Sequence, residues 1–229
     1  MKKRSKRYWE GKSAEKMRAP HFIGEALQCL FAMKRAKFDE TVELSLHLAL
    51  DPKQSDQTVR GIVKLPYGSG KTVRVVAFTE KPEEALAAGA IAAGLRDLMA
   101  RVEGGWCDFD VAVATTSAMK EVRSVAKILG PRGLMPSPKS GTVGDDVEKI
   151  IAEVQAGRSE FKMDKTANIA FAVGKCSFAK DALETNIREA LSAIVRSRPE
   201  SAKGGFIRSA FISSTMSRSV ALNFHEAIA

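Results

Sequence analysis

Residues 41–50, TVELSLHLAL, alternate between two kinds of side chain. Every even position from 42 to 50 is Val or Leu, whereas the odd positions carry Thr, Glu, Ser, His and Ala. Because successive side chains of a strand point to opposite faces, this alternation predicts a half-buried strand with one polar face. Asp51-Pro52 ends the strand, since proline donates no backbone hydrogen bond.

The segments around this strand predict further α+β structure. Residues 22–36, before the strand, place apolar side chains at helical spacing. Residues 59–65, after it, predict a second strand, which Pro66 ends. In the last third of the chain we expect short strands on both sides of 164–168, a helix over 179–196, an alternating strand over 206–216 and a final strand over 219–224.

The middle of the chain has a different pattern, in which strands and helices alternate. Short β-forming runs cover 73–78 and 109–115. Helices are expected from Pro82, over 117–129, and from 145 to 155, each with acidic or capping residues where a helix favours them. Alternation of this kind predicts a small parallel α/β domain.

The distribution of charge indicates how these parts are connected. Residues 68–158 hold 12 Lys/Arg and 12 Asp/Glu, whereas 1–67 and 159–229 together hold 24 cations and 15 anions, which is the whole formal charge of +9. This distribution predicts a domain of residues 68–158 inserted into a basic domain that both termini form. A basic domain is typical of nucleic-acid-binding proteins. The first seven residues, five of them Lys or Arg, add an arm suited to phosphate contacts.

Membranes, metals and disulfides are not indicated. No apolar run approaches the roughly 20 residues of a membrane-spanning helix, and no apolar segment follows the basic N-terminus, so we expect a cytoplasmic protein without membrane contact. Cys29, Cys107 and Cys176 are too few and too widely spaced for a disulfide framework or a metal knuckle. The three histidines are equally scattered. We therefore expect no metal site and no catalytic centre.

Gly68-Ser69-Gly70-Lys71-Thr72 looks like the end of a phosphate-binding P-loop. The full motif needs a glycine where Leu65 stands, and it must open a helix, whereas a strand is expected here. The α/β middle also lacks a GxGxxG turn. An RNA-dependent NTPase is thus the weaker alternative. We expect a turn at a domain junction, no cofactor and no enzymatic activity.

Residues 128–143, ILGPRGLMPSPKSGTV, are dense in Gly and Pro and carry two cations. From the residues alone this is a stiff exposed loop, either a contact surface or a connector between helices. The segment also resembles the signature of the large-subunit ribosomal protein "L-one" family, the protein of the mobile stalk beside the tRNA exit site. Residues 37–75, 157–178 and 206–216 resemble the other blocks of that family, in the same order.

The resemblance implies a fold and several partners. The family has a two-layer α+β domain formed by both termini and an inserted three-layer Rossmann-like α/β domain. The first domain is its principal RNA binder. The implied partners are the stalk region of large-subunit rRNA on the ribosome, the deacylated tRNA whose release the stalk assists, and, in bacteria, the mRNA of the protein's own operon, which it represses.

The resemblance also assigns RNA-contact positions in three blocks. The first holds Lys37, Phe38, Thr41 and Glu43. The second holds Asp164, Lys165 and Thr166, with Lys175 and Ser177 nearby. The third holds Ser209, Ser213, Ser214, Thr215 and Met216, followed by Ser217 and Arg218.

Apart from the resemblance, the chemistry of the side chains also bears on several of these positions. Thr41 and Glu43 occupy the polar face of the alternating strand, and Ser209, Ser213 and Thr215 share one face of another. Hydroxyl groups suit the recognition of sugar edges and RNA shape, although a solvated face is the usual explanation of such a strand. A carboxylate at Glu43 would accept bonds from a 2′-OH or a base amine and oppose non-specific binding. Without the family, a buried core position would be the commoner fate of Phe38.

The chain departs from the family at two places. Ser217-Arg218 stands where the family usually has Gly-Pro, and Ala167 stands where it has glycine. If the first glycine allows a close approach of backbone to RNA, Ser217 must fit a tighter space, which a phosphate contact of Arg218 would offset. These departures bear on contact detail and affinity more than on binding itself.

Overall fold

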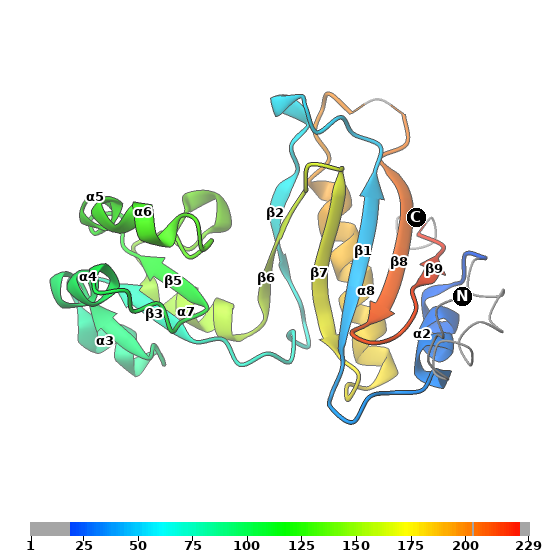
Figure 1. The fold of residues 1–229 in the computed structure, drawn as a ribbon, viewed down its shortest axis with the longest axis horizontal. Helices are drawn as coiled ribbons and strands as arrows, with labels where there is room; N and C mark the ends of the chain where they lie inside the picture. The colour runs from blue at the N-terminus through cyan, green and yellow to red at the C-terminus, as the bar shows by residue number, and fades with distance from the viewer. Residues whose placement is uncertain (1–18, 203, 225–229) are drawn as a thin grey trace, which may run out of the picture. The chain divides into compact units, whose positions relative to one another are not determined.

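The computed structural model describes residues 19–202 and 204–224, so the basic arm at residues 1–7 lies outside the described part. It has a mixed α/β fold with two compact units (Figure 1). Unit 1 spans Met1–Gly70 and Ser159–Ala229, and unit 2 spans Lys71–Arg158. No helix among the described residues is long and apolar enough to cross a membrane.

Unit 1 is built on a four-stranded antiparallel sheet. Its order is β7 (Asn168–Lys175), β1 (Thr41–Leu48), β8 (Ile207–Ser214) and β9 (Val220–Leu222). Along β1 the even positions are buried and the odd positions are exposed or half-buried, as the alternation predicts. The sheet therefore has one buried face and one open face.

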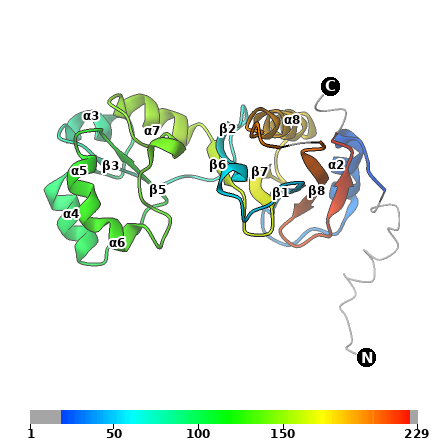
Figure 2. The ribbon, with the colours of Figure 1, turned by 90° about the horizontal axis from the view of Figure 1, so that it is seen from above.

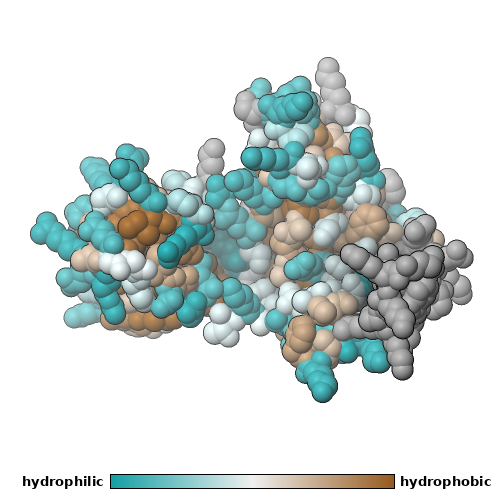
Figure 3. Space-filling model, in the orientation of Figure 1, coloured by the Kyte–Doolittle hydropathy of each residue, from teal (hydrophilic) through white to brown (hydrophobic). Residues whose placement is uncertain are grey.

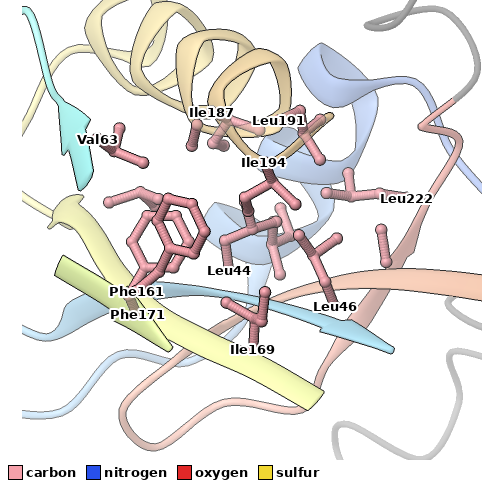
Figure 4. Close-up of a cluster of buried hydrophobic side chains, with 14 of the residues drawn as sticks. Leu44, Leu46, Val63, Phe161, Ile169, Phe171, Ile187, Leu191, Ile194 and Leu222 are labelled. Carbon is pink, nitrogen blue, oxygen red and sulfur yellow. The ribbon is translucent and has the colours of Figure 1, made fainter. Parts of the chain in front are cut away.

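Two helices cover the buried face. The longer, α8 (Lys180–Arg196), and the shorter, α2 (Ile23–Ala32), contribute their apolar sides to the same core as the even positions of β1. Figure 4 shows Ile187, Leu191 and Ile194 of α8 packed toward Leu44 and Leu46. Each such side chain stabilises the fold by about 1.5–3 kcal/mol on burial.

A small second sheet belongs to the same core. It pairs β2 (Arg60–Lys64) with β6 (Arg158–Lys162) after a short 3-10 turn, η3 (Ser55–Gln57). Gly61 is required here, because a Cβ would lie 2.7 Å from Cζ of Phe161. The Phe161 ring in turn lies 6.1 Å from the ring of Phe171. Close packing therefore fixes the small sheet against the large one.

Unit 2 has a parallel sheet in the order β4 (Ala92–Gly94), β3 (Val75–Phe78) and β5 (Val111–Ala114). Alternate residues of β3 and β5 enter two different apolar clusters. One cluster includes α4 (Arg96–Glu103), α5 (Met119–Val122), η4 (Arg123–Val125) and α6 (Ala126–Leu129), and the other includes α3 (Pro82–Ala87) and α7 (Val147–Gln155). Helices thus cover both faces of the sheet (Figure 2).

Three details differ from the expectations. The helix expected over 22–36 ends at Ala32, because Met33 is already extended toward the first strand. The helix expected over 117–129 is three short segments, since Val125 departs from α geometry. β4 and α4 were not expected. The three residues of β4 carry no β-forming side chain, and α4 buries only Leu98 and Val102.

The loop over 128–143 connects α6 to α7 and contains one further turn, η5 (Pro138–Ser140). Its end is tied to the α/β sheet, because Ala114 N donates to Thr142 O (3.0 Å). Arg158 Nη2 donates to Ser140 O (3.1 Å), and a Cβ on Gly141 would collide with that guanidinium. The loop is thus an ordered connector between helices.

Candidate nucleic-acid interface

Glu40 fastens the loops that meet at the beginning of β1. It is 1% exposed, although it is acidic. Its Oε1 accepts the N–H of Ala36 (2.5 Å), and its Oε2 accepts the N–H of Met216 (3.2 Å) and the hydroxyl of Ser214. Its carbonyl accepts the N–H of Cys176 (2.8 Å). One buried side chain therefore holds the loop before β1 against the loop after β8.

A second set of bonds crosses the same end of the sheet. Thr41 N donates to Thr215 Oγ1 (3.0 Å), and Thr215 N donates to Thr41 O (3.1 Å). Lys175 Nζ donates to Thr41 Oγ1 (2.7 Å). Ser177 donates through its N–H (3.1 Å) and its hydroxyl (2.8 Å) to the carboxylate of Asp39. Residues of the first and third blocks, together with Lys175 and Ser177, thus form one ordered rim, which we call the loop rim (residues 35–41, 175–177 and 215–218).

Two large apolar side chains are exposed on the loop rim. Phe38 and Met216 are each 55% exposed, and Lys37 between Ala36 and Phe38 is exposed too. The exposure of Phe38 rules out the core position that is the commoner fate of phenylalanine. Burying two such side chains against a partner would remove apolar surface from water, so the rim is suited to a contact.

The open face of the sheet continues from the loop rim. Glu43 of β1 lies opposite Ser213 of β8, and Ser45 lies opposite Phe211. Phe211 is 37% exposed, the third large apolar side chain on this side of unit 1. Figure 3 shows the face over β7, β1 and β8 as a mixture of hydrophilic and weakly apolar side chains. Polar groups and one aromatic ring are thus available beside the rim.

The second block of predicted residues forms a separate turn between β6 and β7. Asp164 Oδ1 accepts the N–H of Thr166 (2.8 Å) and of Asn168 (2.7 Å), and the Thr166 hydroxyl also donates to this carboxylate. The backbone N–H of Asn168, followed by the Thr166 hydroxyl, lowers the pKa of Asp164 below its usual value. Lys165 is exposed at the tip. The turn is therefore rigid and presents one free-standing cation.

This turn lies at the other end of the sheet from the loop rim. Asn168, at its edge, pairs with His47, whereas Thr41 pairs with Lys175. Thr41 and His47 are six residues apart along β1, which is about 20 Å at a rise of roughly 3.3 Å per residue. Ser209 also pairs with His47. The predicted residues therefore form two groups, with the open sheet face between them.

The side chains of the predicted residues are not equally accessible. Phe38, Lys37, Glu43, Thr215 and Met216 are exposed, and Ser209, Ser213, Lys175, Ser217 and Arg218 are half-buried. Ser214 is 8% exposed and its hydroxyl is bound to Glu40, so its part in any contact is to support the loop.

Sequence reasoning missed four residues that belong to this surface. These are Asp39, Glu40, His47 and Phe211. A signal for Glu40 existed, because its even number puts it on the buried face of the alternating strand, where a carboxylate needs bonded partners. For Phe211 the signal was its odd number, which it shares with Ser209 and Ser213 on the open face.

The GSGKT segment at residues 68–72 opens no helix. Asn186 of α8 binds it instead, since its Nδ2 donates to Gly68 O (3.0 Å), and the chain then leads into β3. Among the described residues no group of three or more His, Cys, Asp or Glu is placed to hold a metal ion.

The family of the chain follows from comparison with known proteins. The model of the ribosomal protein L1p/L10e family matches residues 30–218. This chain belongs to that family. Large ribosomal subunit protein uL1 of Kosmotoga olearia is 45% identical over 100% of both chains. Its namesake in Protochlamydia amoebophila is 50% identical over 89% of this chain and 87% of its own, and that in Rhodococcus erythropolis is 45% identical over 94% and 91%.

Membership of the L1p/L10e family confirms the resemblance seen in the sequence blocks. It identifies the chain as a structural ribosomal protein of the large subunit and not an enzyme. The structure describes both positions at which the chain departs from the pattern implied by the resemblance, Ser217-Arg218 and Ala167.

The two positions differ in their local geometry in this L1p/L10e protein. Ser217 accepts the N–H of Ser214 (2.8 Å) and donates to Arg218 O (3.0 Å), so its hydroxyl closes the turn after β8. Among the described residues other than glycine, Ala167 alone has a positive φ, of 60°. Only the second departure therefore places a side chain where backbone geometry favours glycine.

Proposed function

We propose that this protein binds the stalk region of large-subunit rRNA near the tRNA exit site, through the loop rim and the open sheet face of unit 1. The observation that carries the proposal is the fastening by Glu40, which presents Phe38 and Met216 outward from two loops far apart in sequence. A preorganised rim loses little conformational entropy on binding. The ribosome of the cytoplasm is then the site of action.

The rim offers the chemistry that structured RNA requires. Phe38 and Met216 supply apolar surface for a ribose or an unstacked base, and Lys37 supplies a cation for phosphate. Thr215 and Ser213 supply hydroxyls for 2′-OH groups and base edges. The carboxylate of Glu43 repels phosphate, so it favours a binding orientation in which a hydrogen-bond donor of the RNA, such as a 2′-OH or a base amine, faces it. Selectivity for shape thus accompanies general affinity.

The proposal extends to the organisation of the chain and to its further partners. Unit 1 would be a two-layer α+β RNA-binding domain formed by both termini, with unit 2 as an inserted three-layer Rossmann-like domain. We further propose that the protein assists the release of deacylated tRNA and represses translation through the mRNA of its own operon, as the resemblance implies. Both depend on the same RNA-binding surface or on its movement with the stalk.

The test compares two RNAs across a series of salt concentrations. The whole chain should bind a stalk rRNA fragment more tightly than an unrelated duplex RNA at every salt concentration, because shape recognition survives screening better than phosphate contacts. Equal affinity for the two RNAs would remove specific recognition from the proposal.

Two exposed phenylalanines of unit 1 allow a matched variant pair. Phe38→Ala should weaken binding to the stalk fragment by about 1–3 kcal/mol if the ring stacks on a base. Phe22→Ala, at a 50% exposed position away from the loop rim, should leave binding unchanged. Equal losses in the two variants would place the contact elsewhere.

A further inference from the structure

Unit 2 has no net charge, yet its cations differ in their surroundings. Five of its twelve Lys and Arg side chains are ion-paired: Lys71 and Arg74 bind Asp110, Lys81 binds Glu84, Lys149 binds Asp146, and Arg158 binds Glu153. A sixth, Arg101, lies over the ring of Trp106. Local pairing of this kind leaves little field for an approaching polyanion.

Four cations form an exception, and together they make the outer cation row: Lys120, Arg123, Lys127 and Arg132. All four are exposed, and their side chains form no ion pair or hydrogen bond with the described residues. Elsewhere in the described part of unit 2, only Arg96 is comparable. The row is therefore the main uncompensated positive charge of this unit.

The helical segments α5, η4 and α6 arrange the row on one side. Residues 118–130 form three consecutive right-handed helical segments, with a departure from α geometry at Val125, and the buried positions are Ala118, Val122, Val125 and Leu129. At about 100° per residue, Lys120, Arg123 and Lys127 fall within roughly 50° of the direction opposite these buried positions. The core thus orients the three cations outward.

The spacing of the row suits a phosphate backbone. Lys120 and Lys127 are seven residues apart, which is about 10 Å along a helix and comparable to three phosphate-to-phosphate steps along the axis of one duplex strand. The segment 118–132 has one acidic residue, Glu121, about 100° around the helix from Lys120. Arg132 extends the row into the loop that follows α6.

We propose that the outer cation row is a second RNA-binding surface, which contacts phosphates without reading sequence. RNA is favoured over a membrane or a protein, because stable binding to either of those usually adds buried apolar side chains to the electrostatic attraction. The exposed large apolar residues described in unit 2 are Leu86 and Ile91, beside α3 on the other face of the sheet. The inference goes beyond the proposed function, which assigns specific binding to unit 1.

The experiment uses the whole chain and two triple variants of equal charge. The row variant is K120Q/R123Q/K127Q, and the control is K81Q/R96Q/K149Q, which removes three exposed cations elsewhere in unit 2. Binding is measured against three probes over a salt series: a stalk rRNA fragment, deacylated tRNA and an unrelated duplex RNA. All six substituted side chains are exposed, so both variants should fold.

The row variant should lower the slope of log affinity against log salt by about 2–3, since each lost phosphate contact contributes roughly 0.7–0.9. The control should change the slope by less than about 1. A smaller slope for the row variant with all three probes supports a general contact with the RNA backbone. A smaller slope with tRNA alone supports the proposal and identifies tRNA as the RNA that the row binds. In each case the row variant should keep the wild-type preference for the stalk fragment.

Three results would overturn the inference. An equal slope change in the row variant and the control would reduce the effect to net charge. An unchanged slope in both variants would show that the row makes no phosphate contact. Loss of binding to phosphatidylglycerol vesicles in the row variant, with RNA binding unaltered, would assign the row to a membrane surface. If instead the wild-type chain shows no preference for the stalk fragment, the proposed function of unit 1 fails while the slope comparison still decides on the row.

Discussion

Glu40 determines the geometry of the loop rim. Glu40→Ala would leave the N–H groups of Ala36 and Met216 and the hydroxyl of Ser214 without their acceptor. Since each unsatisfied buried group costs about 1–3 kcal/mol, we expect the free energy of unfolding to fall by about 3–5 kcal/mol, measured by urea denaturation. Glu43→Ala, on the open face, is the control and should stay within about 0.5 kcal/mol. Similar small losses in both variants would contradict the fastening role.

Two opposing contributions to stability meet at Ala167. Its φ of 60° costs about 1–2 kcal/mol for an L-residue, which Ala167→Gly would relieve. Its methyl group is 3% exposed, however, and removing it loses about 0.8 kcal/mol of burial, while the freer unfolded chain of glycine loses about 0.4–1 kcal/mol more. We therefore expect a change within about 1 kcal/mol by thermal unfolding. A gain above about 2 kcal/mol would show that backbone strain dominates.

In a strand, the odd or even position of a residue predicts the face of the sheet that its side chain occupies better than its residue type does. The alternation predicted the buried face of β1 correctly, although the strand ends at Leu48 and not at Leu50. The same parity would have identified Glu40 and Phe211. What the alternation cannot give is the partner of a buried carboxylate. Ser214 and Met216 lie more than 170 residues away, and only the pairing of β1 with β8 brings them to Glu40.

At the scale of elements, α8 holds the chain where it leaves β2. Asn186 is fully buried; its Oδ1 accepts the N–H of Tyr67 (3.1 Å), and its Nδ2 donates to the carbonyls of Gly68 (3.0 Å) and Val173 (2.8 Å). Asn186→Leu should lower the free energy of unfolding by about 2–4 kcal/mol in urea. Thr185→Ala, at the exposed neighbouring position, should have an effect below about 1 kcal/mol, and a comparable loss there would mean that α8 itself is weakened.

Asp110 joins the beginnings of β3 and β5. It accepts bonds from Lys71 Nζ (2.8 Å) and from Arg74 N (3.1 Å) and Nε (3.1 Å), and the Lys71 bond, ahead of those from Arg74, lowers its pKa to about 2. Because the folded pKa is depressed, this contribution is complete above the unfolded value of about 3.9 and is lost as the pH falls through about 2. Asp110→Asn should thus cost about 1 kcal/mol at pH 7 and nearly nothing at pH 2. Thermal unfolding at both pH values checks this, and a constant difference would contradict it.

The elements with regularly spaced apolar side chains were those that the sequence could predict. The helix expected over 179–196 is α8, Lys180–Arg196, because it has enough turns for its apolar stripe to be regular. β4 is three small residues whose strand geometry depends on its neighbour β3, so nothing local marks it. The separation of Asp164–Thr166 from the loop rim likewise depends on the register of β1 with β7, which no local pattern fixes.

At the scale of the molecule, the two units have separate cores. The apolar cluster of unit 1 draws only on residues 23–65 and 161–222, and the two clusters of unit 2 draw only on residues 75–154. All of the excess charge in the sequence lies in the two ends of the chain, outside residues 68–158. The proposed roles, selective binding by unit 1 and phosphate binding by unit 2, can be tested by separating the units.

A chain that joins residues 1–70 to 159–229 through a flexible Gly/Ser linker should fold and retain the preference for the stalk rRNA fragment. Gly70 belongs in this chain, because its backbone packs against Lys175 and Phe178. Since the joined chain lacks the outer cation row, the slope of its log affinity against log salt should be smaller than that of the whole chain by about 2–4. Circular dichroism verifies folding, and a filter-binding series gives the slope. A folded joined chain without preference for the stalk fragment would refute the assignment of specific binding to unit 1, whereas an unchanged slope would remove unit 2 from RNA contact.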